Sequence, residues 1–160
     1  MESGTLTQTA SALGQVQSGT SAFRRTNVAF FAAGFVTFVT LYDVQPLLPE
    51  FAQEFGVSPA LSSLPLSVST ATLAIAMLIA GTLSETTGRK QIMTTALLLT
   101  SMLAFFTAFC HTFSSLLIVR LLQGLVLAGL PAVAMAYLAE ELDSSALGSA
   151  MGLYISGNAI

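Results

Sequence analysis

Four long, uninterrupted apolar runs constrain the fold of this 160-residue chain more than any other feature. They cover residues 27–48, 61–83, 91–110 and 114–138. Each has about the 20 residues that a helix needs to cross the hydrocarbon core of a bilayer. Because lipid offers the backbone no hydrogen-bond partner, and because the runs are continuous rather than alternating, these segments are predicted to be helices. The sequence therefore predicts an all-α membrane protein.

Composition excludes several other classes of protein. Hydrophobic residues make up 54% of the chain and charged residues 8%, whereas soluble domains have about 25% charged residues. A water-soluble enzyme is therefore not expected, and the scattered basic residues, with a net charge of −3, form no patch for nucleic acid. Cys110 and His111 are the only residues of their types, so we predict neither a metal site nor another cofactor.

The two ends of the chain differ from the four spans. Residues 1–26 are rich in Ser, Thr, Gln and Gly, which predicts a disordered leader. A secretion signal is disfavoured because the apolar run that follows is too long and more such runs come after it. A fifth apolar segment, 144–160, is shorter than a full span. We therefore expect the N-terminal bundle, 27–160, to stop inside a fifth helix.

The basic residues predict the orientation of the chain in the membrane. Those outside the spans are Arg24, Arg25, Arg89 and Lys90. They lie in the leader and in the loop 84–90, whereas the loops 49–60 and 111–113 have none. Since Lys and Arg mark cytoplasmic loops, the N-terminus and the loop 84–90 are predicted to be cytoplasmic. The acidic loop 139–143 is then on the same side.

Two charged residues, Asp43 and Arg120, lie well inside predicted spans. With a rise of about 1.5 Å per residue, each is about 9 Å from the outer end of its helix, so the two can pair if their helices are neighbours. Gln123 shares the helix face of Arg120 and can hydrogen-bond in the same space. The alternative is that both charges reach the outer interface and only fix the tilt. Pro46 is expected to bend the first helix beyond Asp43.

Asp43 is the best candidate for a group that takes up and releases a proton. Desolvation favours a neutral carboxyl and a nearby Arg favours a carboxylate, so a conformational change can alter its protonation. The Ser and Thr residues between Ser62 and Thr72 are interpreted as helix-packing residues rather than solute ligands.

The segment 81–90 resembles the signature loop of the major facilitator superfamily, G-x-x-x-D-[RK]-x-G-[RK]-[RK]. The matching residues are Gly81, Gly88, Arg89 and Lys90, with Glu85 in place of the Asp. Thr86 departs from the pattern, because the family has a basic residue there. In the family this loop latches the two halves of the transporter together with an acid at the end of the fourth helix. Glu140 or Glu141 is expected to be that acid in this chain.

Two further segments resemble motifs of the same superfamily. Arg120, Gln123 and Gly124 match its R-x-x-Q-G motif in the fourth helix, although Val126 stands where another glycine is expected. Gly148 and Gly157 resemble the start of the glycine-rich fifth-helix motif of exporters, with Asn158 in place of a Pro. The resemblance implies helix-packing roles for four glycines, which are Gly124, Gly129, Gly148 and Gly157.

The resemblance implies a twelve-helix transporter of two six-helix halves, of which this chain is the N-terminal part. It implies proton-coupled export of a small organic solute across the bacterial inner membrane, as in drug- and sugar-efflux members. Asp43 and Arg120 are expected to couple the proton. Lipid, protons, the solute and a C-terminal half are the expected partners. An uptake symporter of the same superfamily and a non-transporting scaffold or regulatory protein remain alternatives. A membrane enzyme is not expected, since the spans show no catalytic arrangement.

Overall fold

The computed structural model describes residues 20–141 and 144–157, with side chains at all of these except residues 22, 135, 139–141 and 144–146. The regular secondary structure of this part of the chain is entirely helical, which confirms the predicted all-α class. Four of its helical segments are long and apolar enough to span a membrane. The chain divides into two compact units, a central unit, Val36–Val133, and a terminal unit, Met1–Phe35 with Ala134–Ile160.

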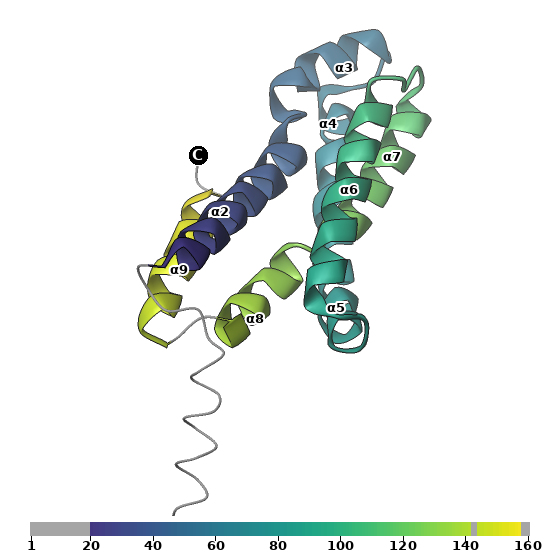
Figure 1. Ribbon diagram of the computed structural model, residues 1–160. Helices are drawn as coiled ribbons and strands as arrows, with labels where there is room; N and C mark the ends of the chain where they lie inside the picture. The colour runs from purple at the N-terminus through teal and green to yellow at the C-terminus, as the bar shows by residue number, and fades with distance from the viewer. Residues whose placement is uncertain (1–19, 142–143, 158–160) are drawn as a thin grey trace, which may run out of the picture. The chain divides into compact units, whose positions relative to one another are not determined.

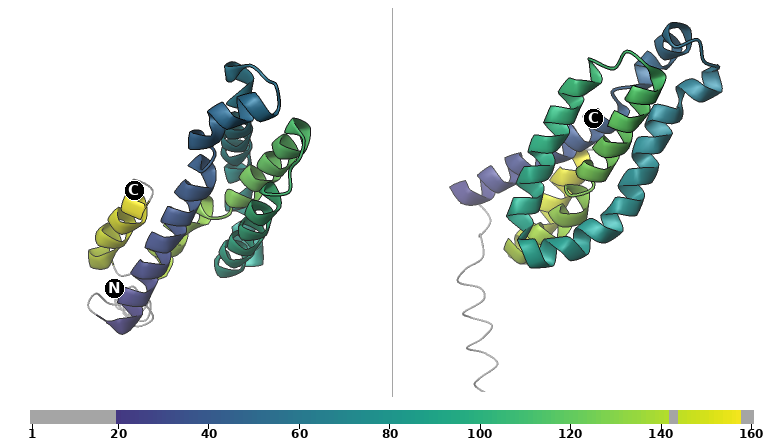
Figure 2. Two further views of the ribbon diagram at one scale, coloured as in Figure 1. Left: turned by 90° about the horizontal axis from the view of Figure 1, so that it is seen from above. Right: turned by 90° about the vertical axis from the view of Figure 1, so that its right-hand side faces the viewer.

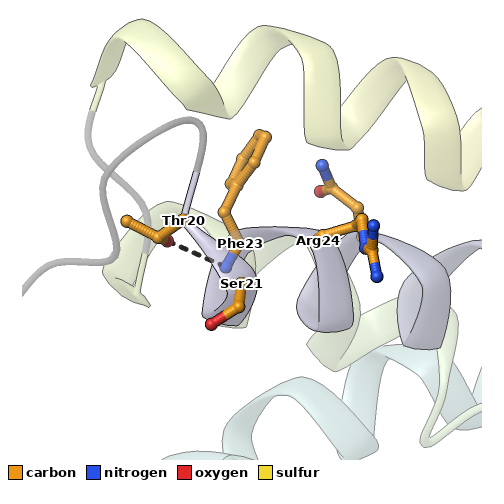
Figure 3. A pocket seen from close by; sticks show the side chains of 5 residues that line it. Thr20, Ser21, Phe23 and Arg24 are labelled. Carbon is orange, nitrogen blue, oxygen red and sulfur yellow. Dashed lines mark hydrogen bonds between the residues drawn. The ribbon is translucent and has the colours of Figure 1, made fainter.

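Helix α2, Ser21–Tyr42, begins before the first apolar run. The Thr20 Oγ1 atom accepts a hydrogen bond of 3.1 Å from the Phe23 N–H, which is the N-cap contact that Ser and Thr commonly provide. Figure 3 shows this contact beside a hollow of about 510 Å³ lined by Thr20, Ser21, Phe23, Arg24 and Asn27. Residues 21–26, predicted to belong to the disordered leader, are therefore helical, and residues 1–19 lie outside the described part.

The first span is interrupted near its end, as Pro46 predicts. Helix α2 ends at Tyr42, a short 3₁₀ helix η1 covers Gln45–Leu47, and α3 covers Leu48–Glu54. A proline has no N–H to donate to the carbonyl four residues earlier, and its ring collides with that carbonyl. The prediction of a bend at Pro46 is confirmed.

The second and third spans are joined by a turn of a single residue. Helix α4, Pro59–Ser62, precedes α5, Leu64–Thr87, and α6, Arg89–Thr107, follows at once. Gly88 adopts a φ of 97°, a conformation that L side chains rarely reach. This confirms Gly88 as the turn residue. The other residues of the predicted loop 84–90 are helical instead. The chain changes direction at Gly88 alone, so α5 continues to Thr87 and α6 begins at Arg89.

The fourth apolar run was predicted as one helix, and the structure has one candidate span there, Phe113–Leu138, with an interruption inside it. It forms α7, Phe113–Leu127, and α8, Pro131–Glu141, and α9, Ser144–Gly157, follows. Pro131 cannot donate to the Leu127 carbonyl. That carbonyl instead accepts a bond of 3.0 Å from the Leu130 N–H. The tightened turn before Pro131 therefore separates the two helices.

In the central unit α5, α6 and α7 lie side by side (Figures 1 and 2). A buried cluster of this unit consists of Leu41 from α2, Ala96 from α6, Leu127 from α7 and Leu130 from the turn after α7. In the terminal unit the α2 residue Phe30 stacks on Tyr137 of α8 with ring centroids 5.5 Å apart and meets Tyr154 of α9 edge-on at 6.4 Å.

Candidate functional site

The central unit brings Asp43 and Arg120 together. The Arg120 Nη2 atom lies 2.9 Å from Asp43 Oδ1, within hydrogen-bond and ion-pair distance. Asp43 follows the last turn of α2, and Arg120 lies in the middle of α7. The side chain of Arg120 is 2% exposed and that of Asp43 is 41% exposed. One partner is therefore enclosed by the helices, and the other is open on one side.

The same guanidinium has a second acceptor on α2. Arg120 Nη1 donates a hydrogen bond of 3.0 Å to the Thr40 carbonyl. This carbonyl belongs to the last turn of α2, where carbonyls have no donor within the helix. A cation at a helix C-terminus is also favoured by the helix dipole. Arg120 thus caps the end of α2 and pairs with Asp43 at the same time.

Ser69 of α5 holds the backbone of α7 beside this ion pair. Its Oγ atom lies 3.0 Å from the Arg120 carbonyl and 2.9 Å from the Pro65 carbonyl, and these two acceptors share its single hydroxyl proton. Ser69 is 2% exposed. Sequence analysis assigned it only to helix packing, and no local signal singles it out from the neighbouring Ser and Thr residues.

Gln123 lies beside Arg120 in the interior, also 2% exposed. In the described part of the chain, neither its amide oxygen nor its amide nitrogen has a hydrogen-bond partner, and the same holds for Arg120 Nε. Buried polar atoms without a partner are uncommon. Gln123 is thus buried three residues after Arg120 on α7, and its predicted hydrogen bond across the space is not formed among the described residues.

The signature-loop residues lie at the junction of α5 and α6. Glu85 and Lys90 are exposed, and Arg89 is partly buried. A Cβ atom placed on Gly81 would have no atom within 4 Å among the described residues. The side chains of Glu140 and Glu141 lie outside the described residues, so the predicted latch stays a prediction.

Of the four glycines predicted to pack helices, three make close contacts. If Gly124 had a Cβ atom, that atom would lie 2.3 Å from the Ser69 carbonyl oxygen. A Cβ atom added to Gly129 would lie 3.0 Å from the Ala96 Cβ. In the terminal unit, a Cβ at Gly157 lies 2.6 Å from the carbonyl oxygen of Phe31. Gly148 has open space around it, so it mediates no helix contact in the part of the chain described.

Comparison with known proteins supplies the family. Residues 28–160 match the Major Facilitator Superfamily. The uncharacterized MFS-type transporter YybF of Bacillus subtilis (strain 168) is 56% identical over 145 residues, which are 91% of this chain and 36% of the relative. The inner membrane transport protein YnfM of Escherichia coli (strain K12) is 50% identical over 145 residues, which are 91% of this chain and 35% of the relative. The multidrug resistance protein MdtL of Klebsiella pneumoniae is 35% identical over 96 residues, which are 60% of this chain and 24% of the relative.

No solved structure matches the chain. The chain spans about a third of the length of the curated relatives YybF and YnfM. The family match begins at residue 28, inside the first of the four candidate membrane spans, and includes the other three spans and both members of the Asp43–Arg120 ion pair. The chain is thus part of an integral membrane protein, and it belongs to the Major Facilitator Superfamily of transporters.

Proposed function

We propose that the protein is a proton-coupled exporter of a small organic solute in which Asp43 takes up and releases the coupling proton. The observation that carries this proposal is the contact of 2.9 Å between Asp43 and the buried Arg120. A charged residue inside a membrane span is costly and usually serves an ion or substrate pathway. An acid that is paired with a guanidinium and also open on one side has the two properties that such a role requires.

The proposed mechanism follows from the asymmetry of the ion pair. Asp43 is the exposed member, so a proton can reach its carboxylate, whereas Arg120 is enclosed. A proton on Asp43 cancels the charge that attracts the guanidinium, which weakens the link between α2 and α7. We propose that the two halves of the transporter then rock around the shared cavity. Coupling requires that proton and solute bind the two states with different affinities.

The names of relatives support the finer parts of the proposal. MdtL is named as a multidrug resistance protein and YnfM as an inner membrane transport protein. We therefore propose export and a location in the bacterial inner membrane, with the N-terminus in the cytoplasm as the basic residues predict. A second six-helix half, protons, lipid and the solute are the proposed partners of this chain.

Substitution of Asp43→Asn tests the proposed coupling role. The intact transporter is reconstituted in lipid vesicles, and the transport of a panel of fluorescent organic dyes is measured with and without a pH gradient. We expect the native protein to move a dye against its concentration gradient when protons flow down their own gradient in the opposite direction. The Asn variant loses this uphill transport, because its amide cannot carry a proton, but keeps downhill exchange.

Glu50→Gln is the matched control, since Glu50 is an exposed carboxylate in the first turn of α3. It is expected to transport like the native protein. Uphill transport by the Asp43→Asn variant excludes Asp43 as the coupling group. Dye movement in the same direction as the protons contradicts export and indicates a symporter.

A further inference from the structure

The two members of the ion pair are held very differently. Arg120 is buried, and its guanidinium donates to both the Thr40 carbonyl and Asp43. Asp43 lies beyond the end of α2, in the two-residue turn that precedes η1. Its side chain is 41% exposed and has Arg120 as its hydrogen-bond partner among the described residues. A buried group with several contacts is harder to displace than an exposed group with one.

Ser69 adds a contact that acts on the backbone under the guanidinium. Its hydroxyl lies 3.0 Å from the Arg120 carbonyl and is buried. Two other hydroxyls of α5 provide a comparison. Ser67 and Thr70 donate to carbonyls four residues earlier on the chain, at 3.2 Å and 2.9 Å, and both are exposed. Ser69 has that same local acceptor, the Pro65 carbonyl, and shares its one hydroxyl proton with a second acceptor, the Arg120 carbonyl of α7.

The backbones of α5 and α7 are in contact one turn further along α7. Gly124 lies so close to α5 that a Cβ atom there is only 2.3 Å from the Ser69 carbonyl oxygen and 2.6 Å from Thr72 Oγ1. Ser69 therefore contacts α7 twice, through its hydroxyl at Arg120 and through its carbonyl at Gly124. A helix fixed at two neighbouring turns has little freedom to rotate or slide at Arg120.

We propose that Ser69 is a positioning residue that holds Arg120 at the end of α2, so that Asp43 is the partner that moves when the ion pair opens. This inference rests on the proposed function, in which the ion pair opens on protonation. The Thr40 carbonyl keeps the guanidinium in place after Asp43 has become neutral, because a backbone carbonyl does not titrate. Arg120 is then a fixed charge, and the exposed carboxyl leaves it and returns to it.

The first test observes Arg120 directly and needs no transport. Arginine side chains of the full chain in lipid nanodiscs are labelled with ¹⁵N, and the exchange of guanidinium protons with water is measured by NMR. The Arg120 signal is identified by its loss in Arg120→Lys. We expect slow exchange in the native chain and about fivefold faster exchange in Ser69→Ala, the factor that corresponds to one ordinary hydrogen bond. Thr70→Ala, the matched control, leaves the rate unchanged.

Asp43→Asn serves as the mimic of the protonated state in the same experiment. We expect its Arg120 protons to stay closer to the native rate than those of Ser69→Ala, since the Thr40 carbonyl still accepts. An unchanged rate in Ser69→Ala overturns the proposal. Exchange in Asp43→Asn as fast as in Ser69→Ala also overturns it, because Arg120 is then the mobile partner.

The second test uses transport by the intact protein and separates positioning from simple helix packing. Ser69→Ala is expected to change the pH at which proton-driven dye transport is half-maximal, whereas Ser69→Thr, which retains a hydroxyl, keeps the native pH profile. A uniform loss at every pH in Ser69→Ala, or equal changes in both variants, contradicts positioning. If Asp43→Asn still transports uphill while the NMR rates behave as expected, the coupling role fails and the positioning of Arg120 stands.

Discussion

The guanidinium of Arg120 makes two contacts that depend on its shape as well as on its charge. Nη1 reaches the Thr40 carbonyl at 3.0 Å while Nη2 reaches Asp43 Oδ1 at 2.9 Å. A planar fork of donors can hold both acceptors with little loss of freedom, whereas the ammonium of a lysine is a compact point charge. The two acceptors therefore fit the guanidinium of an arginine better than the ammonium of a lysine, although both carry one positive charge.

Arg120→Lys is expected to destabilise the protein although it conserves the charge. The loss of one hydrogen bond to a charged group amounts to about 1.5–3 kcal/mol. Thermal unfolding in detergent provides the measurement, with Arg25→Lys as the control because Arg25 is exposed. Equal melting temperatures for the Arg120→Lys variant and the native protein contradict the two-contact arrangement.

Gly124 lies at a point of very close contact between α5 and α7. Gly124 is buried and faces the backbone carbonyl of Ser69, whereas Gly81 on α5 has nothing within 4 Å of a Cβ position. Both glycines belong to motifs that the sequence shares with the superfamily. Their structural tasks differ, because only Gly124 lies where two helix backbones approach each other.

Gly124→Ala is expected to destabilise the pair of helices by about 1–3 kcal/mol, the usual cost of placing an additional group in a packed interior. Gly81→Ala is the matched control and is expected to be neutral or slightly stabilising, since alanine is the better helix former. Thermal unfolding of the two variants provides the comparison. A Gly124→Ala protein as stable as the Gly81→Ala protein is incompatible with the close contact.

At the scale of the whole molecule, the short connections determine how the chain crosses the membrane. Gly88 joins α5 and α6 on one side, and the connection with Cys110 joins α6 and α7 at the opposite ends of these helices. Since Arg89 and Lys90 lie next to Gly88, the proposed orientation places the Gly88 turn in the cytoplasm and Cys110 outside.

The native Cys110 provides one of two label sites that test the orientation. A membrane-impermeant maleimide is expected to react with Cys110 in intact spheroplasts that contain the full transporter. A Thr86→Cys protein that also has Cys110→Ser carries its thiol next to the Gly88 turn, where Thr86 is exposed. It is expected to react only after the membrane is permeabilised. If Thr86→Cys reacts in intact spheroplasts and Cys110 reacts only after permeabilisation, the proposed orientation is wrong and the opposite one holds.

The sequence by itself determined the local features of this protein. The lengths of the apolar runs predicted the four spans, Pro46 predicted the bend in the first, and Gly88 predicted the tight turn. Each of these depends on a property of a short stretch of chain, such as a missing N–H or an allowed φ. The matching depths of Asp43 and Arg120 also follow from helix rise alone.

Only the tertiary structure decided which residues face a neighbouring helix. The sequence could not show that Gly124 faces a helix backbone while Gly81 and Gly148 face open space, or that Ser69 rather than Ser67 or Thr70 bonds to α7. In a nearly uniformly apolar helix, periodicity gives little indication of which side is buried. The rotation of each helix is determined by the close contacts that its neighbours allow, and those neighbours are distant in the sequence.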